Sequence, residues 1–271
     1  MDLVFERRGD GPPLVLLHGI GHRHQAWRPV MDLLAAERDV IAVDLPGFGA
    51  SPPLPPGTPY TVDGTLDVLA EFFARLGVER PHVAGNSLGG LFALEAADRG
   101  LAGSATALSP AGFFNARELR RAATILRATR LGARLPEPVL TRLAGVPRLK
   151  AAMFGMIYGR PHRLDLETVA GDARAMRAAP AFEPTLRAGR GVRFRGRCEN
   201  VPVTIGWGTR DRLLGVTQAV RAQRMLPHAR FVWLEGCGHV PMNDDPELVA
   251  KVLLEGSGHQ LAGGRDAAAT A

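Results

Sequence analysis

Three residues far apart in the sequence could together perform nucleophilic chemistry. Ser87, Asp211 and His239 each follow shortly after an apolar run that is typical of a buried strand. A serine hydroxyl is a weak nucleophile at neutral pH, so it needs a neighbouring base during attack. His239 is the candidate base, because an unperturbed imidazole titrates near neutrality. Asp211 is the candidate carboxylate that would orient the imidazole and stabilise its protonated form.

The local sequence around Ser87 predicts a sharp turn between a strand and a helix. Gly-Asn-Ser-Leu-Gly-Gly at 85–90 follows the apolar run 81–84 and precedes a helical pattern at 91–95. Gly85 and Gly89 permit close packing that a Cβ would block, and such a turn lifts the serine Oγ out of the sheet. The pattern is short and recurs by chance, so the alternative is an ordinary turn serine.

Other acids compete with Asp211 for the orienting role. Asp44 is expected to be a structural residue of its Pro-Gly-Phe-Gly loop, and the strand at 105–110 ends without a carboxylate. Asp244 and Asp245 precede Pro246, where acids suit the start of the last helix. Asp211 is therefore the favoured acid.

Most of the other histidines have simpler interpretations. His18 is expected to order the loop that follows it, and the alternative for His239 is a loop histidine without a catalytic role. We expect solvated positions for His22, His24, His162 and His228. Cys237, two residues before His239, is expected to be a small packing residue.

The order of these motifs resembles that of the α/β-hydrolase superfamily over nearly the whole chain, from about residue 3 to residue 256. Besides the serine turn, the acid and the Gly-Cys-Gly-His turn at 236–239, the chain carries Leu-Leu-His-Gly-Ile-Gly at 16–21 and Asp-Leu-Pro-Gly-Phe-Gly-Ala-Ser at 44–51. Nucleophile, acid and base follow one another in the order of this fold. The resemblance implies an oxyanion hole made by the backbone N–H groups of Ile20 and Leu88.

The alternation of apolar runs and helical patterns predicts an α/β fold with a mostly parallel, doubly wound sheet of about seven strands, after a short first hairpin. Strands are expected at 3–7, 14–17, 40–43, 82–84, 105–108, 203–207 and 230–234, and helices at 25–36, 62–76, 88–98, 217–225 and 246–254. Residues 1–110 and 198–256 would form the core. Residues 111–197 resemble the helical cap that the family inserts after its sixth strand, and we expect residues 257–271 to be disordered.

Composition is compatible with a cytoplasmic enzyme. The chain has 271 residues and a net charge of +6, and its two cysteines lie far apart in sequence. It has no stretch of 18 apolar residues and no signal-peptide pattern at its first residues. Segment 111–197 holds 18 Lys and Arg against 6 Asp and Glu. That charge is either a solvated face or a surface that attracts an anionic substrate, a carrier protein or a membrane, and no nucleic-acid-binding motif accompanies it.

The leading hypothesis is a serine hydrolase that acts on a small to medium carboxylic ester and needs no metal or organic cofactor. Within the family, dehalogenases and epoxide hydrolases place Asp at the position of Ser87, so acyl chemistry remains. The serine turn also resembles that of hydrolases that cleave carbon–carbon bonds in ring-fission diketones, although their oxyanion loop usually reads His-Gly-x-Gly-Pro-Gly, whereas 18–23 reads His-Gly-Ile-Gly-His-Arg. Thioesterases, perhydrolases and biosynthetic cyclases share the triad. A ligand-binding module without catalysis is the non-enzyme alternative.

The substrate-lining residues are expected to come from the cap, although an apolar cap residue can equally be part of the cap's own core. The candidates are Phe113, Phe114, Met153, Phe154, Met156 and Tyr158. Spacing does not give the oligomeric state.

Overall fold

The computed structural model, described here for residues 1–258, contains one seven-stranded sheet. Its order is β1-β3-β2-β4-β5-β6-β7, and every neighbouring pair is parallel except β1 with β3. This confirms the predicted fold class. The strands are β1 (Phe5–Arg8), β2 (Pro13–Leu17), β3 (Asp39–Val43), β4 (His82–Asn86), β5 (Ser104–Leu108), β6 (Val203–Gly208) and β7 (Arg230–Leu234).

The expected first hairpin is wrong, because β1 does not pair with β2. Phe5 lies opposite Val43 in an antiparallel ladder, so β1 occupies the outer side of β3. Both sides of β2 are already taken by parallel neighbours, β3 and β4. An apolar, fully paired central strand leaves no edge for a hairpin partner.

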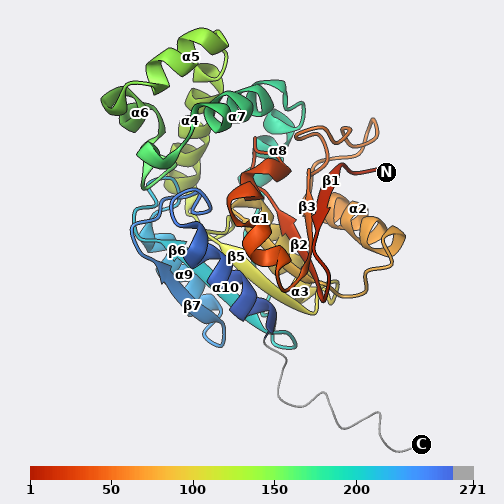
Figure 1. The fold of residues 1–271 in the computed structure, drawn as a ribbon. Helices are drawn as coiled ribbons and strands as arrows, with labels where there is room; N and C mark the ends of the chain where they lie inside the picture. Colours follow the sequence, from red (N-terminus) through yellow and green to blue (C-terminus); the bar gives the residue numbers. More distant parts are fainter. Residues whose placement is uncertain (259–271) are drawn as a thin grey trace, which may run out of the picture.

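Helices cover both faces of the sheet (Figure 1). α1 (Arg28–Ala35) and α10 (Pro246–Gly258) contact each other on one face, whereas α2 (Val62–Arg75) and α3 (Leu88–Asp98) contact each other on the other. A 3-10 turn, η1 (His24–Trp27), leads into α1, and α9 (Val216–Met225) joins β6 to β7. Thr61 begins α2 by accepting a hydrogen bond from the Gly64 N–H, which is a typical N-cap.

The segment between β5 and β6 is helical. It contains α4 (Ala116–Gly132), α5 (Glu137–Ala144), α6 (Pro147–Phe154), α7 (Leu166–Ala178) and α8 (Phe182–Ala188), with the short 3-10 turns η2 (Pro161–Arg163) and η3 (Gly189–Gly191). Asn115 and Glu118 form a capping box at the start of α4. Helices α4 to α7 gather at one end of the molecule (Figure 1), and we call α4 to α8 the inserted helices.

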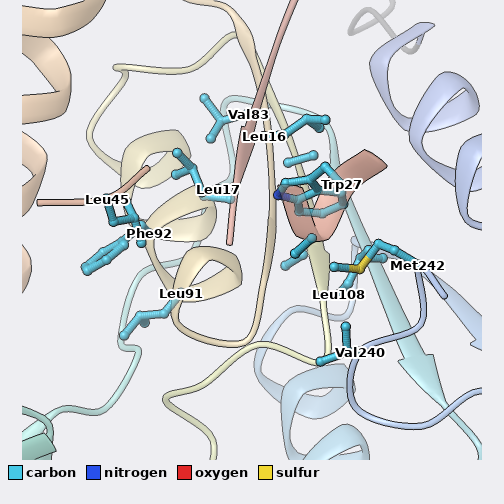
Figure 2. Close-up of a cluster of buried hydrophobic side chains, with 14 of the residues drawn as sticks. Leu16, Leu17, Trp27, Leu45, Val83, Leu91, Phe92, Leu108, Val240 and Met242 are labelled. Atoms are coloured by element: carbon cyan, nitrogen blue, oxygen red, sulfur yellow. The ribbon is translucent and has the colours of Figure 1, made fainter. Parts of the chain in front are cut away.

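A continuous buried cluster supports the loops at the carboxyl ends of the strands (Figure 2). Leu17 ends β2 just before His18, Leu108 ends β5, and Val240 follows His239; all three are almost fully buried. Trp27 fills the space among Leu16, Leu108 and Met242 in the same cluster. Close packing of this kind holds the loop ends in one arrangement.

α10 continues to Gly258, so residues 257 and 258 are helical and were wrongly assigned to the disordered tail. The rest of that expected tail, residues 259–271, lies outside the described residues. Within residues 1–258 no helix is long and apolar enough to cross a bilayer.

Candidate active site

Ser87 lies in a strained turn between β4 and α3. Its backbone has φ +56° and ψ −111°, a region that residues with a side chain rarely adopt. The turn is fixed on both sides, because the Ser87 N–H donates to the Leu108 carbonyl at 2.9 Å and the Ser87 carbonyl accepts from the N–H of Ala111 at 2.9 Å. Backbone strain of this kind persists where the surrounding structure over-determines it, and it is common at functional sites.

Two glycines make this turn possible, as the sequence predicts. A Cβ on Gly85 would lie 2.1 Å from the Gly89 carbonyl oxygen, and a Cβ on Gly89 would lie 2.1 Å from the carbonyl oxygen of Leu17. Neither position has room for a side chain. The start of α3 therefore packs directly against β2 and β4.

The structure brings two of the three predicted residues into direct contact. His239 Nδ1 lies 2.8 Å from Asp211 Oδ2, and both side chains are buried. The second oxygen, Oδ1, accepts from the N–H groups of Leu213 and Leu214 at 2.9 and 2.8 Å. A carboxylate held in this way fixes the orientation of the imidazole and favours the tautomer with its proton on Nδ1.

Asn86 is a positioning residue that the sequence pattern does not predict. Its side-chain Nδ2 donates to the carbonyl of His239 at 2.8 Å and to the carbonyl of Leu108 at 3.1 Å. The side chain next to Ser87 thus joins the turn at Ser87 to the loop that carries His239, which we call the histidine loop. The signal in the sequence was a polar amide at the end of an apolar strand, where a buried side chain needs partners.

Asp244 is not a helix-capping residue as expected, because its buried carboxylate binds backbone groups of two segments. Oδ2 accepts from the N–H of Gly238 at 2.7 Å and of Gly159 at 2.8 Å, and Oδ1 accepts from the N–H of Arg160 at 2.7 Å. The neighbouring Asp245 does accept at the start of α10, from the N–H of Leu248 at 3.2 Å.

Backbone contacts reinforce this junction between the inserted helices and the histidine loop. The N–H of His239 donates to the Ile157 carbonyl at 2.6 Å. A Cβ on Gly238 would lie 2.4 Å from the nitrogen of Gly159, so the two chains touch. We call residues 157–160, 238, 239 and 244 the clasp. Through the clasp, the connection between α6 and η2 helps to set the position of His239.

His18 orders the loop that follows it. Its Nε2 accepts from the N–H of Leu45 at 3.0 Å, and its Nδ1 lies 2.7 Å from the Gly19 carbonyl, to which it donates in the matching tautomer. Burial lowers the pKa of His18 to about 4, so the ring is neutral at pH 7.

Asp44 has the structural role expected of it. It accepts from the N–H groups of His24 and Ala50. Burial alone would raise the pKa of Asp44, but hydrogen bonds from His24 and Ala50 hold it below its usual value.

Two of the histidines expected to be solvated are not. His24 is buried, with Nδ1 3.0 Å from Asp44 Oδ1, and His22 is half-buried. Gly21, at the end of the preceding loop, packs against Met176 and Phe182 of the inserted helices. His24 turns inward beside Asp44 and loses the solvent that a free loop would give it. His162 and His228 are exposed, as expected.

The loop with Ile20 passes beside the serine. A Cβ on Gly19 would lie 3.3 Å from the Ser87 Cβ. Among residues 1–258, the backbone N–H groups of Ile20 and Leu88 donate to no other protein group. These two N–H groups are therefore candidate donors for an oxyanion at Ser87.

Two cavities meet at Ser87. The larger has a volume of about 460 Å³ and the smaller of about 100 Å³. Ile20, Leu126 and Leu213 line both, but only the larger is lined by His239. Within the described residues, neither cavity is lined by a lysine or an arginine.

The residues that were expected to line the substrate site divide between the cavities. Phe114 lines the smaller one, and Met153, Phe154, Met156 and Tyr158 line the larger one. Phe113 lines neither. It is buried against Phe194, with ring centroids 5.7 Å apart.

The buried Cys237 lies beside the histidine loop as a packing residue. Burial raises its thiol pKa to about 12, so the thiol is protonated at neutral pH.

This fold and its strained serine turn define an α/β hydrolase. The model of the alpha/beta hydrolase family matches residues 14–252, and the chain belongs to that family and is a hydrolase. An uncharacterized protein of Mycobacterium tuberculosis is 31% identical over 260 residues, which cover 90% of this chain and 74% of that protein.

Two further relatives have informative names. A pimeloyl-[acyl-carrier protein] methyl ester esterase of Aeromonas hydrophila is 30% identical over 269 residues, which cover 93% of this chain and 98% of that enzyme. Among solved structures, a bacterial membrane phospholipase A is 28% identical with a TM-score of 0.74, covering 95% of this chain and 83% of that one.

Proposed function

We propose that the protein hydrolyses carboxylic esters through an acyl-enzyme formed on Ser87. The observation that carries the proposal is the pairing of His239 with Asp211 at 2.8 Å, on a histidine that lines the same cavity as Ser87. A serine in a strained turn, a buried imidazole with an oriented tautomer and an apolar cavity together suit acyl transfer.

In the proposed reaction, Ser87 Oγ attacks the ester carbonyl carbon while His239 accepts the hydroxyl proton. The negative charge that forms on the carbonyl oxygen is stabilised by the N–H groups of Ile20 and Leu88. His239 then returns the proton to the departing alcohol, and Asp211 stabilises the imidazolium in between. A water molecule, activated by His239, attacks the acyl-enzyme and releases the acid.

The cavities favour an uncharged substrate over the acidic diketones of carbon–carbon bond hydrolases. A carboxylate needs a cationic or strongly donating partner when it leaves water, and no lysine or arginine among the described residues lines either cavity. The positive charge of the inserted helices lies outside the cavities. This observation ranks ester hydrolysis above the alternative that the basic segment first suggested.

A carrier-bound ester is the second candidate. The Aeromonas relative is named for an ester attached to acyl-carrier protein, and segment 111–197 of this chain holds 18 basic against 6 acidic residues. Such a surface would attract an acidic carrier through its summed field.

The cytoplasmic location expected from the two cysteines stays a prediction.

The test is hydrolysis of a p-nitrophenyl ester series, from acetate to decanoate, by the wild type and by Ser87→Ala. We expect activity in the wild type and none above background in the variant, with the folding of both checked by circular dichroism. A folded wild type that leaves every ester intact would overturn the proposal. Activity that survives in Ser87→Ala would show that Ser87 is not the nucleophile.

A further inference from the structure

The two cavities at Ser87 are unequal in size and only one of them contains the proposed base. His239 and Asn86 line the larger cavity and not the smaller, whereas Leu88 lines the smaller and not the larger. This inference rests on the proposed function. The asymmetry decides which half of an ester, acyl or alcohol, lies in which cavity, because only the alcohol half must reach the base.

The leaving group must lie beside the base. When the tetrahedral intermediate collapses, the C–O bond to the alcohol breaks and the alcohol oxygen takes the proton from His239 Nε2. The alcohol half therefore occupies the cavity that His239 lines. Water must later enter from the same side, because His239 also removes the proton from water as it attacks the acyl-enzyme. The acyl half stays bound to Ser87 throughout and needs no access to the histidine.

We propose that the larger cavity is the alcohol subsite and the smaller cavity is the acyl subsite, so the preferred substrates are short-acyl esters of larger, uncharged alcohols. A cavity of about 150 Å³ holds benzene. By that measure the smaller cavity, about 100 Å³, accommodates about four carbon atoms. The larger, about 460 Å³, accommodates an alcohol several times that size.

The alcohol subsite also contains a carboxylate. Asp172 of α7 lines it, with Oδ1 3.8 Å from Arg23 Nε and Oδ2 3.4 Å from the Tyr158 hydroxyl. His22 lines the same cavity, and its Nδ1 is buried without a hydrogen-bond partner in the described chain. A negative charge and an unpartnered imidazole nitrogen suit a neutral alcohol, including one that carries a hydroxyl group, and disfavour an anionic one.

Two isomeric esters test which half of the substrate each cavity holds, without a change in total hydrophobicity. Octyl acetate has a short acyl group and a long alcohol, whereas methyl nonanoate has the reverse. We expect kcat/KM for octyl acetate to exceed that for methyl nonanoate by at least about tenfold, because one methylene that does not fit a pocket already costs about that much. Equal values, or a preference for methyl nonanoate, would overturn the assignment. A preference for methyl nonanoate would favour the carrier-bound second candidate instead, because the Aeromonas relative is named for a methyl ester of a carrier-bound pimeloyl group.

A matched pair of filling variants tests which cavity holds which half. Ala123 of α4 lines only the smaller cavity and Ala173 of α7 only the larger. Leucine favours helix, so both Ala123→Leu and Ala173→Leu retain the local structure. We expect Ala123→Leu to lower kcat/KM for ethyl butyrate relative to ethyl acetate, and Ala173→Leu to lower it for octyl acetate relative to ethyl acetate. The opposite pattern would reverse the subsites.

The charge preference has its own comparison. An acetate ester whose octyl chain ends in a carboxylate, 8-acetoxyoctanoate, should be at least about tenfold poorer than octyl acetate, since no lysine or arginine among residues 1–258 lines the cavity and Arg23 lies behind Asp172, with which it pairs. Equal rates for the two esters would contradict the preference of the larger cavity for an uncharged alcohol. Failure of the proposed function is distinguishable from all of these results, because the wild type would then hydrolyse none of the esters.

Discussion

At the scale of single residues, the contact between Asp211 and His239 is the most specific feature of the site. Asp211 uses one oxygen for the imidazole and the other for two backbone N–H groups, so its position is fixed from both sides. The sequence predicted this pair from the positions of the two residues after strands. It did not predict the role of Asn86. The side-chain amide of Asn86 donates a hydrogen bond to the carbonyl of His239, which lies 153 residues away in the chain.

Asp211→Asn should remove the orientation of the imidazole with little change in shape. The amide cannot accept both from His239 and from the loop N–H groups, so the wrong tautomer is favoured. We expect kcat to fall by about 10⁴-fold with the fold retained. Steady-state kinetics with p-nitrophenyl acetate measures kcat. The control is Asp32→Asn, which changes an exposed carboxylate on α1. A loss below tenfold would exclude the assigned role.

Two buried histidines should make stability depend on pH. Burial lowers the pKa of His82 to about 3 and that of His18 to about 4. In the unfolded chain each titrates near 6.5, so the unfolded state binds more protons between pH 6.5 and 4. The free energy of unfolding is therefore undiminished above about pH 6.5 and falls below it, by about 1.4 kcal/mol per pH unit for each histidine.

His82→Gln provides the check, because glutamine can keep hydrogen bonds to Ser104 and Thr106, which contact the imidazole at 2.6 and 3.0 Å. Urea unfolding at several pH values from 7 to 5 should show a shallower decline in the variant than in the wild type. Identical slopes in the two proteins would mean that His82 does not remain neutral in the folded state.

At the scale of elements, the serine turn depends on glycines that touch neighbouring backbone. Gly89→Ala places a Cβ 2.1 Å from the Leu17 carbonyl oxygen, so β2 or α3 must move. We expect a loss of about 1–3 kcal/mol in the free energy of unfolding, together with lower activity. Gly132→Ala is the matched control, since nothing lies within 4 Å and the site is helical. That control should be neutral or stabilising by up to about 1 kcal/mol, and a neutral Gly89→Ala would contradict the tight packing.

The clasp joins an inserted segment to the histidine loop. Asp244→Asn keeps one acceptor oxygen where the carboxylate serves three N–H groups, so at least one buried N–H loses its partner. We expect a loss of about 1–3 kcal/mol in stability and a lower kcat with a nearly unchanged KM, because His239 shifts and the cavities do not. Asp32→Asn, an exposed carboxylate on α1 outside the clasp, should leave kcat within about twofold of the wild type. Normal kcat in Asp244→Asn would show that the clasp does not position His239.

Across the whole molecule, the regular parts were predictable and the long-range pairings were not. Apolar runs located all seven strands. The signal is strongest for β2 to β6, because buried strands in parallel pairing, covered on both faces, read as continuous apolar segments. The pairing of β1 with β3, the binding of Asp244 to residues 159 and 160, and the burial of His24 all depend on segments that meet only in the folded chain. Side-chain periodicity carries no information about such partners.

The central claim, that Ser87 is an activated nucleophile, is tested most directly by labelling with a fluorophosphonate and locating the adduct by mass spectrometry. We expect one adduct, on Ser87, which forms much more slowly in His239→Ala and is absent in Ser87→Ala. Labelling of a folded sample at another residue would show that Ser87 is not the activated nucleophile. So would a Ser87 that stays unmodified while a neutral apolar dye is shown to enter the larger cavity.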